Sequence, residues 1–166
     1  TDSESQADGL DSGADGYISR PIPNRELLSR IKAVLRLKEA QAAVHESELR
    51  YRIMFERASD GILFVSTDLK IIAVNQSFAR MHGYTVEELK DMDLRKLDAP
   101  DSSILVPERV RRILAGESIK FVAQHIHKDG HSFPVEVSSS LITYSGVNLI
   151  QAFHRDISDR MQMENL

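Results

Sequence analysis

The chain has 166 residues, of which 42% are apolar and 28% charged, and its formal net charge is −4. Lys and Arg are scattered rather than gathered on a basic face, so we expect no nucleic-acid partner. No apolar run reaches the ~20 residues that span a bilayer, so we expect no membrane segment and a cytoplasmic location. Because cysteine is absent, a thiolate nucleophile, a disulfide and a cysteinyl cofactor adduct are excluded.

The first 58 residues predict a polar segment followed by one long helix. Residues 1–16 are polar and rich in glycine, and a short strand is expected at Tyr17 to Ser19. Asn24 can cap a helix that runs to about Ala58. Its apolar positions fall in two registers, first Leu28, Ile31 and Leu35, then Leu37, Ala40, Val44, Ser47, Tyr51 and Met54. The change of register indicates two contact surfaces; a coiled coil and packing on the chain's own domain both remain open.

A β-hairpin and a capped helix are expected next. Two apolar runs, Ile62 to Val65 and Ile71 to Val74, flank a polar turn, which is the pattern of a hairpin. Asn75 can cap a short helix over residues 76–82. Gly83 then ends this helix, because glycine readily adopts the left-handed conformation of a C-cap.

The second half of the chain predicts more helix and then three strands. Thr85 and Glu88 have the spacing of a capping box and open another short helix. A further helix is expected from about Ser103 to Leu114, with Pro107 near its first turn. The remaining apolar runs predict strands at Ile119 to His127, Ser132 to Tyr144 and Val147 to Ile157. Two strands, short helices and three strands indicate an α+β fold with a five-stranded antiparallel sheet and helices on one face.

The turn Lys128-Asp129-Gly130 leaves two registers open for the hairpin that contains it. A two-residue Asp-Gly loop places Val122, Gln124 and Ile126 on the core face. A three-residue loop with Gly130 as a bulge places Phe121, Ala123 and His125 there instead. The composition of the preceding strand does not decide between the two.

Four segments resemble the successive blocks of a PAS sensory domain: ELRYRIMFERASDGILFV, VNQSFARMHGYTVEEL, HKDGHSFPVEVSSS and HRDIS. They occur in the family's order over about residues 48–159. The resemblance implies a five-stranded antiparallel sheet whose short helices enclose a small pocket, in agreement with the element order above. Family hairpins of this kind favour the three-residue loop, so we expect His125 to face the core. The resemblance also implies that the domain senses a ligand, cofactor or partner and passes the change along its flanking helices.

The opening residues resemble the end of a response-regulator receiver domain of a bacterial phosphorelay. Thr1 matches the switch threonine, Tyr17 the switch aromatic and Arg20-Pro21 the usual Lys-Pro pair. About residues 1–37 are therefore expected to be the C-terminal fragment of a receiver, without its phosphoacceptor strand. The expected organisation is a receiver remnant over 1–23, a linker helix over 24–58, a PAS domain over 59–157 and the start of an output helix over 158–166.

The resemblance also implies a set of pocket residues. The candidates are His125, His154, Phe121, Val135, Val137 and Phe78. His154 matches the position at which flavin-binding members place a glutamine that reaches their cofactor. Two imidazoles in one cavity can bind a polar or anionic ligand; alternatively, each is a buried histidine bonded to a backbone carbonyl. We expect Phe78 and Met81 to be core residues rather than part of a cofactor site.

The cofactor is left open. Lack of cysteine excludes a covalent flavin adduct. The resemblance implies that a haem-binding member has a histidine on the long helix before the third strand, and the helix expected at Ser103 to Leu114 contains none, so haem is disfavoured. Noncovalent flavin remains open. His125, His127 and His131 have the His-x-His spacing of metal ligands, but we interpret them as residues of the hairpin tip and expect no metal site.

Three residues are expected to relay the signal or cap helices: Asn75, Arg155 and Asp156. Asp156 matches the aspartate of the family's closing Asp-Ile-Thr motif and would cap the exit helix, with Asp159 at its third position. No nucleophile elbow, P-loop or zinc-protease motif occurs, so the segment is expected not to be an enzyme. Any kinase or cyclase activity would lie in a domain outside this chain.

We therefore expect the sensory module of a two-component-type protein. It would bind a small ligand and form a homodimer through the linker helix and the outer face of the sheet. The alternative is a ligand-free PAS domain that serves protein interaction and dimerisation.

Overall fold

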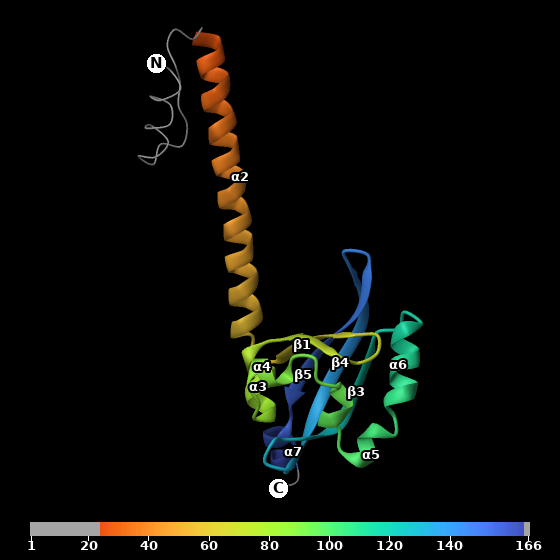
Figure 1. The fold of residues 1–166 in the computed structure, drawn as a ribbon. Coiled ribbons are helices and arrows are strands. Elements are labelled where there is room, and N and C mark those ends of the chain that lie inside the picture. Colours follow the sequence, from red (N-terminus) through yellow and green to blue (C-terminus); the bar gives the residue numbers. More distant parts are fainter. Residues whose placement is uncertain (1–23, 165–166) are drawn as a thin grey trace. The chain divides into compact units, whose positions relative to one another are not determined.

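The computed structural model describes residues 24–164 of the chain (Figure 1). By its internal contacts the chain divides into two compact units, with the boundary between Arg50 and Tyr51. The strand expected at Tyr17 to Ser19 and the receiver remnant over 1–23 lie outside the described residues.

Helix α2 (Asn24–Arg57) forms the described part of the first unit and enters the second. It ends one residue before the predicted boundary, and none of its residues is buried. Leu28, Ile31 and Leu35 are all exposed. Ion pairs between residues four apart, such as Glu46–Arg50 at 2.8 Å, add a few tenths of a kcal/mol to helix stability, on the order of 0.3.

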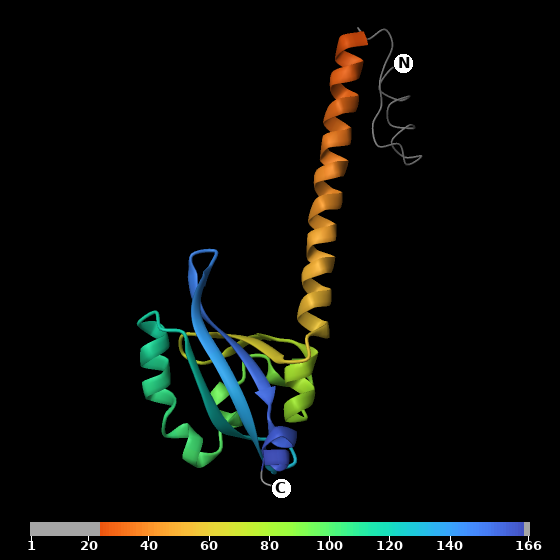
Figure 2. The same ribbon diagram turned by 180° about the vertical axis from the view of Figure 1, so that it is seen from behind.

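The second unit is built on a five-stranded antiparallel sheet, as predicted. Its strands are β1 (Gly61–Ser66), β2 (Ile71–Val74), β3 (Ile119–Ile126), β4 (Ser132–Tyr144) and β5 (Val147–Asp156). Their order across the sheet is β2-β1-β5-β4-β3. The long β4–β5 hairpin continues beyond the other strands to its turn at residues 145–146 (Figure 2).

The register of the β3–β4 hairpin is the one with the three-residue loop. Phe121 lies opposite Val137, and His125 lies opposite Phe133. Gly130 has φ +97°, a conformation that favours glycine because it has no Cβ. His125 therefore faces the core, as the resemblance led us to expect.

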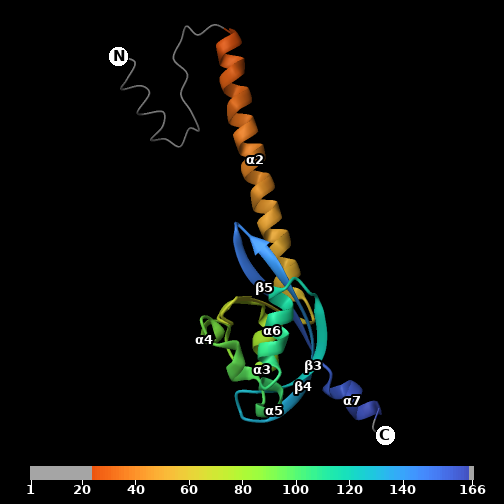
Figure 3. The ribbon, with the colours of Figure 1, turned by 90° about the vertical axis from the view of Figure 1, so that its right-hand side faces the viewer.

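Short helices cover one face of the sheet (Figure 3). They are α3 (Gln76–His82), α4 (Val86–Leu89), the 3₁₀-helix η1 (Leu94–Leu97), α5 (Pro100–Ser103) and α6 (Val106–Leu114). The caps are those predicted: Asn75 accepts a hydrogen bond from Phe78 N, and Gly83 has φ +76°. Thr85 and Glu88 form the reciprocal capping box.

The helix predicted from Ser103 to Leu114 is wrong at its start. The chain forms α5 up to Ser103, breaks at Ile104 and Leu105, and begins α6 at Val106. Pro107 explains the break: it has no N–H to donate to a preceding turn, and its ring clashes with a helical carbonyl four residues earlier. Proline is therefore tolerated only in the first turn of α6.

The apolar core lies between the sheet and the short helices. Its largest fully buried side chains include Phe78, Leu63, Ile71, Leu89 and Leu97. The exit helix α7 (Ser158–Glu164) follows β5. Within residues 24–164, no helix combines the length and apolar character needed to cross a membrane.

Candidate functional site

A cavity of about 60 Å³ lies between the inner face of the sheet and the helices η1 and α6. Four of the six predicted pocket residues line it: His125, His154, Phe121 and Val137. The other two, Val135 and Phe78, are fully buried in the core but do not line it. The lining is mostly apolar, with Asp98, Arg109 and the two histidines among its few polar groups.

The volume of this cavity limits what can occupy it. Pockets for drug-sized ligands measure about 300–1,000 Å³, whereas a water molecule needs roughly 10–15 Å³ of such space. The cavity therefore suits a few water molecules or a ligand of a few non-hydrogen atoms. Flavin and haem do not fit it in this conformation.

Three buried histidines lie beside one another, and two of them, His125 and His154, line the cavity. The last residue of α3, His82, is fully buried, and its Nδ1 lies 2.9 Å from the carbonyl oxygen of Phe78. Its Nε2 lies 2.8 Å from Nδ1 of His125 on β3. The ring centroid of His154, on β5, lies 5.3 Å from that of His125. The fold thus joins histidines from three separate elements.

The hydrogen bonds determine which nitrogens carry protons. A carbonyl oxygen only accepts, so His82 Nδ1 must donate to Phe78. In a neutral ring, Nε2 of His82 is then an acceptor, and Nδ1 of His125 must donate to it. Nε2 of a neutral His125 consequently presents a lone pair on the side of Asp98, whose Oδ1 lies 3.7 Å away.

Burial sets the protonation states of the three histidines and of Asp98. Removal from water disfavours the charged imidazolium and lowers the pKa of His82 to about 4 and that of His125 to about 3. The same cause holds the pKa of His154 well below its ordinary value. For a carboxyl group the effect is opposite: burial raises the pKa of Asp98 to about 6, with Arg109 acting against the rise. Asp98 is therefore the group at the cavity that takes up a proton closest to neutral pH.

His154 differs from the other two histidines. Its Nδ1 is buried and has no hydrogen-bond partner among the described residues. A buried polar atom without a partner costs about 1–3 kcal/mol, so such atoms are rare in folded proteins. Because the ring also lines the cavity, a polar ligand is one way to supply the missing partner.

Arg109 brings a positive charge to the cavity. Its guanidinium carbon lies 3.9 Å from the ring centroid of Phe121, in the geometry of a cation–π contact. Partial burial lowers the pKa of Arg109, an effect that the nearby Asp98 opposes. Arg95, which is paired with Asp93, also lines the cavity. The lining therefore includes two cations, one carboxyl group that is easily neutralised and two neutral imidazoles.

Asn75 connects the end of α2 to the sheet and to α3. Its fully buried side chain accepts hydrogen bonds from Ile62 N at 2.9 Å and Phe78 N at 3.0 Å. It donates to the carbonyl oxygens of Phe55 at 2.9 Å and Asp60 at 3.0 Å. The predicted helix cap therefore also fixes the point at which the entry helix joins the domain.

Arg155 continues this connection to the exit helix. Its guanidinium donates to both carboxylate oxygens of Asp60, at 2.9 and 2.7 Å. The next residue, Asp156, accepts from the backbone N–H of Ser158 at 2.8 Å and from its hydroxyl at 2.6 Å. Because α7 begins at Ser158, Asp159 is its second residue rather than the third.

Sequence reasoning missed three residues of the site: His82, Asp98 and Arg109. Asp98 lies between η1 and α5, where a backbone bridge holds it against His125. Of the three, only His82 could have been found from the sequence pattern. It lies one helical turn after Phe78 and directly before the predicted C-cap Gly83, on the face that must pack on the sheet.

Comparison with known proteins agrees with this fold. A chain titled the PAS domain of HTR-like protein from Haloarcula marismortui has a TM-score of 0.66 and 26% identity, over 72% of this chain and 99% of that one. The methyl sulfide methyltransferase-associated sensor of Methanosarcina acetivorans is 32% identical over 127 residues, 76% of this chain. The sensor histidine kinase TmoS of Ectopseudomonas mendocina is 27% identical over 115 residues, 68% of this chain.

The chain spans only 13% and 12% of the lengths of these two sensor proteins. The family model of the PAS domain matches residues 59–159. This match includes every strand of the sheet and every residue that lines the cavity. The chain belongs to the PAS domain family.

Proposed function

We propose that this chain is the sensory module of a two-component-type signalling protein and that its cavity binds a small polar or anionic molecule. The observation that carries the proposal is the buried His154 Nδ1 without a partner, in a ring that lines a cavity also lined by His125 and Arg109. Sensor proteins among the relatives support the signalling role. Catalytic activity belongs to other domains of such proteins.

The charges at the cavity favour an anion of a few atoms. Arg109 supplies a positive charge that is partly removed from water, and interactions with such a charge are stronger than at the surface. An anion bound there would also favour proton uptake by Asp98, whose pKa is already raised to about 6. Neutral His154 can donate a hydrogen bond to the ligand, whereas the free Nε2 of neutral His125 can only accept one.

The signal would leave the domain through the contacts at its two helices. Asn75 holds the end of α2, Asp60 pairs with Arg155, and Asp156 holds the start of α7. A ligand that binds one arrangement of these contacts more tightly shifts the population toward it, by no more than its difference in affinity.

Thermal unfolding with small probes tests the ligand proposal. Formate, acetate, nitrate and acetamide are added separately to the tag-free chain, and a ligand of the folded state must raise Tm in proportion to its binding. We expect at least one probe to raise Tm in the wild type and not in a His125→Phe/His154→Phe variant. An equal rise in both proteins would refute a role for these histidines. No rise with any probe, and no released small molecule in a native mass spectrum, would favour the ligand-free alternative.

Dimerisation through α2 and the outer face of the sheet is the second part of the proposal. Leu37, Val44 and Tyr51 recur every seven residues on α2 and are 60%, 59% and 58% exposed in the single chain. On the sheet, Val122 and Phe153 are also exposed. Apolar side chains at heptad spacing are typical of a helix that pairs with a second copy.

Sedimentation analysis tests the dimer. Val44→Lys puts a charge into the heptad stripe, whereas Ala42→Lys puts the same charge on a different face of the same helix. We expect the first substitution to dissociate the dimer and the second to leave it intact. A wild-type chain that stays monomeric at all accessible concentrations would contradict the proposal.

We also propose that the residues before Asn24 derive from the end of a receiver domain. Tyr17 and the Arg20-Pro21 pair support this origin. If the proposal is correct, the parent gene encodes an aspartate phosphoacceptor strand directly upstream of this segment. An unrelated upstream sequence would exclude it.

A further inference from the structure

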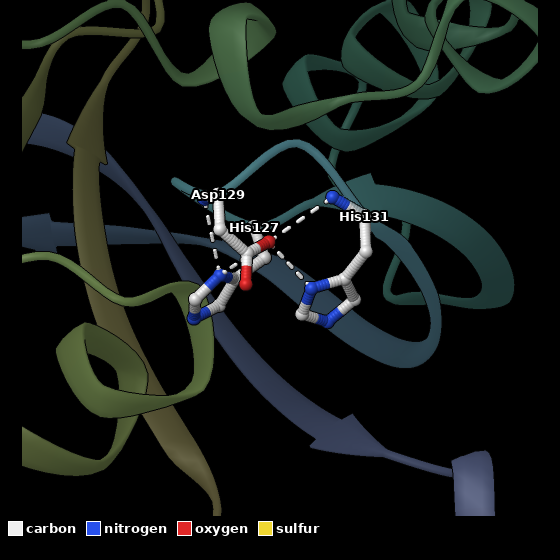
Figure 4. Close-up of side chains that lie close together, drawn as sticks. All are labelled: His127, Asp129 and His131. Carbon is white, nitrogen blue, oxygen red and sulfur yellow. Dashed lines mark hydrogen bonds and ion pairs between the residues drawn. The ribbon is translucent and has the colours of Figure 1, made fainter.

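The turn between β3 and β4 brings three side chains with metal-binding atoms together. His127 N donates to His131 O at 2.9 Å, and Gly130 N donates to His127 O at 2.8 Å. These two backbone bonds close the turn and hold its ends side by side. As a result the side chains of His127, Asp129 and His131 lie on the same side of the loop (Figure 4).

The Asp129 carboxylate lies against the Nδ1 atoms of both imidazoles. Its Oδ1 is 2.9 Å from Nδ1 of His127 and 2.5 Å from Nδ1 of His131. The two rings are stacked, with centroids 4.6 Å apart. One ligand atom from each of the three residues falls within 4.8 Å of the other two. A backbone hydrogen bond from His131 holds the pKa of Asp129 at about 2, so the carboxylate is charged at neutral pH.

The hydrogen bonds at His127 conflict with one another. The backbone N–H of Asp129 donates to Nδ1 of His127 at 3.3 Å, which requires a lone pair on that nitrogen. The same nitrogen lies 2.9 Å from a carboxylate oxygen, which requires a proton on it. A single Nδ1 cannot satisfy both contacts. A cation bound by the lone pairs of the nitrogen and the oxygen would remove the need for a proton between them, and the Nδ1 lone pair would then bind the cation instead of the Asp129 N–H.

The surrounding structure fixes His127 in this orientation. Its ring packs on Gly83 so closely that a Cβ on Gly83 would lie 2.3 Å from Nε2. Only 23% of the His127 side chain is exposed. In addition, Lys128 N donates to His82 O at 2.9 Å, which ties the turn to the end of α3. The ligand atom Nδ1 is thus held on the turn side before any metal binds.

We propose that His127 Nδ1, Asp129 and His131 Nδ1 form a binding site for one divalent transition-metal ion of the zinc type. Two imidazoles, one carboxylate and a water molecule make up a four-coordinate set that zinc accepts. With ligand distances of ~2.0–2.2 Å, tetrahedral donors lie about 3.4 Å apart, so each imidazole Nδ1 needs to move away from Asp129 Oδ1 by less than ~1 Å. Small rotations of the exposed Asp129 and His131 side chains achieve this.

The ligand types also predict which metals bind. Imidazole nitrogens suit zinc, nickel, cobalt and copper, whereas calcium and magnesium prefer oxygen ligands alone. The sequence had led us to expect no metal here, and it had grouped His125 with these histidines. In the structure His125 is buried at the cavity, and Asp129 completes the set instead.

Titration of the tag-free, EDTA-stripped chain with Zn²⁺ tests the site by calorimetry, and Co²⁺ provides a visible absorption spectrum that reports tetrahedral ligation. We expect one ion per chain, no response to Mg²⁺, and affinity about tenfold or more weaker in Asp129→Asn and His131→Asn. Both substituted residues are exposed, so the variants are expected to fold, and circular dichroism checks this. His45→Asn, at an exposed histidine of α2, is the matched control and should bind as the wild type does.

Any of three results would overturn the proposal. The first is the absence of saturable binding at one ion per chain in the wild type. The second is equal affinity in the wild type and both hairpin variants, and the third is loss of binding in His45→Asn. The readout is metal affinity alone, so it does not depend on the cavity ligand.

Discussion

His82 Nε2 and His125 Nδ1 lie 2.8 Å apart in the core, although 43 residues separate them in the sequence. The carbonyl of Phe78 fixes the tautomer of His82, and His82 in turn fixes that of His125. The order of protons along this pair follows from a single backbone acceptor. Any change in the protonation of one ring must therefore be accommodated by the other.

Acid is expected to destabilise the domain. Unfolded histidines take up a proton near pH 6.5, whereas folded His82 does so at about 4 and folded His125 at about 3. The unfolded chain then binds more protons, and the free energy of unfolding falls by about 1.4 kcal/mol per pH unit for each such histidine between these values.

Asp98 opposes this trend. Its raised pKa means that the folded state binds a proton first, which stabilises it as the pH falls through about 6. The three histidines outnumber the one carboxyl, so the net effect remains a loss of stability. Urea denaturation in EDTA at pH 7.5 and pH 5 measures it. Equal or higher stability at pH 5 would contradict the neutral, buried histidines.

Replacement of His154 by Phe is expected to cost little. The substitution removes a buried nitrogen that has no partner among the described residues, so we expect stability at pH 7.5 to be unchanged or about 1 kcal/mol higher. It should also reduce the loss of stability at pH 5. His82→Phe is the matched comparison, because it removes the side-chain hydrogen bonds to Phe78 O and His125 Nδ1 and should destabilise clearly. Equal costs for the two variants would disprove this distinction.

Asn75→Ala is expected to destabilise the domain by about 3 kcal/mol, because it breaks four hydrogen bonds at a fully buried position. Asn148→Ala serves as the control, since Asn148 is exposed and is bonded only to Thr143 within the described structure. Chemical denaturation compares the two. A loss at Asn75 no larger than that at Asn148 would show that Asn75 does not hold the junction of α2, β1 and α3.

Gly83→Ala is expected to cost more stability than Gly130→Ala. Both glycines have positive φ, +76° and +97°, so alanine pays about 1 kcal/mol of backbone strain at either position. At Gly83 the new methyl group also meets the His127 ring at 2.3 Å, whereas nothing lies within 4 Å of it at Gly130. Denaturation curves of the two variants measure the difference. Equal losses would indicate that the His127 ring moves aside at no cost.

Local signals in the sequence predicted much of the fold. The caps at Asn75, Gly83 and Thr85 depend on residues within four positions of each other, so their chemistry can be read directly. Local signals did not predict the register of the β3–β4 hairpin, because Val122 and Phe121 were equally acceptable on the core face. Only the family resemblance decided for Phe121 and His125.

The parts that could not be predicted depend on contacts between distant elements. His82 reaches His125 from another helix, and Asp98 reaches it from an irregular segment with no periodic pattern. The break before α6 was missed because Pro107 is compatible with the first turn of a helix but not with its interior. Asp129 was read as a turn residue, and its position against both imidazoles follows from the closed turn.

Binding of a small anion at the cavity is the central claim, and ¹H–¹⁵N NMR of the labelled chain tests it most directly. Formate, acetate and nitrate are titrated separately, at constant pH and in EDTA. The account predicts saturable shifts for at least one anion, concentrated at the backbone amides of His125, His154 and Arg109 and lost in His125→Phe/His154→Phe. Shifts confined to exposed Lys and Arg residues, or no saturable shift with any of the three anions, would contradict it.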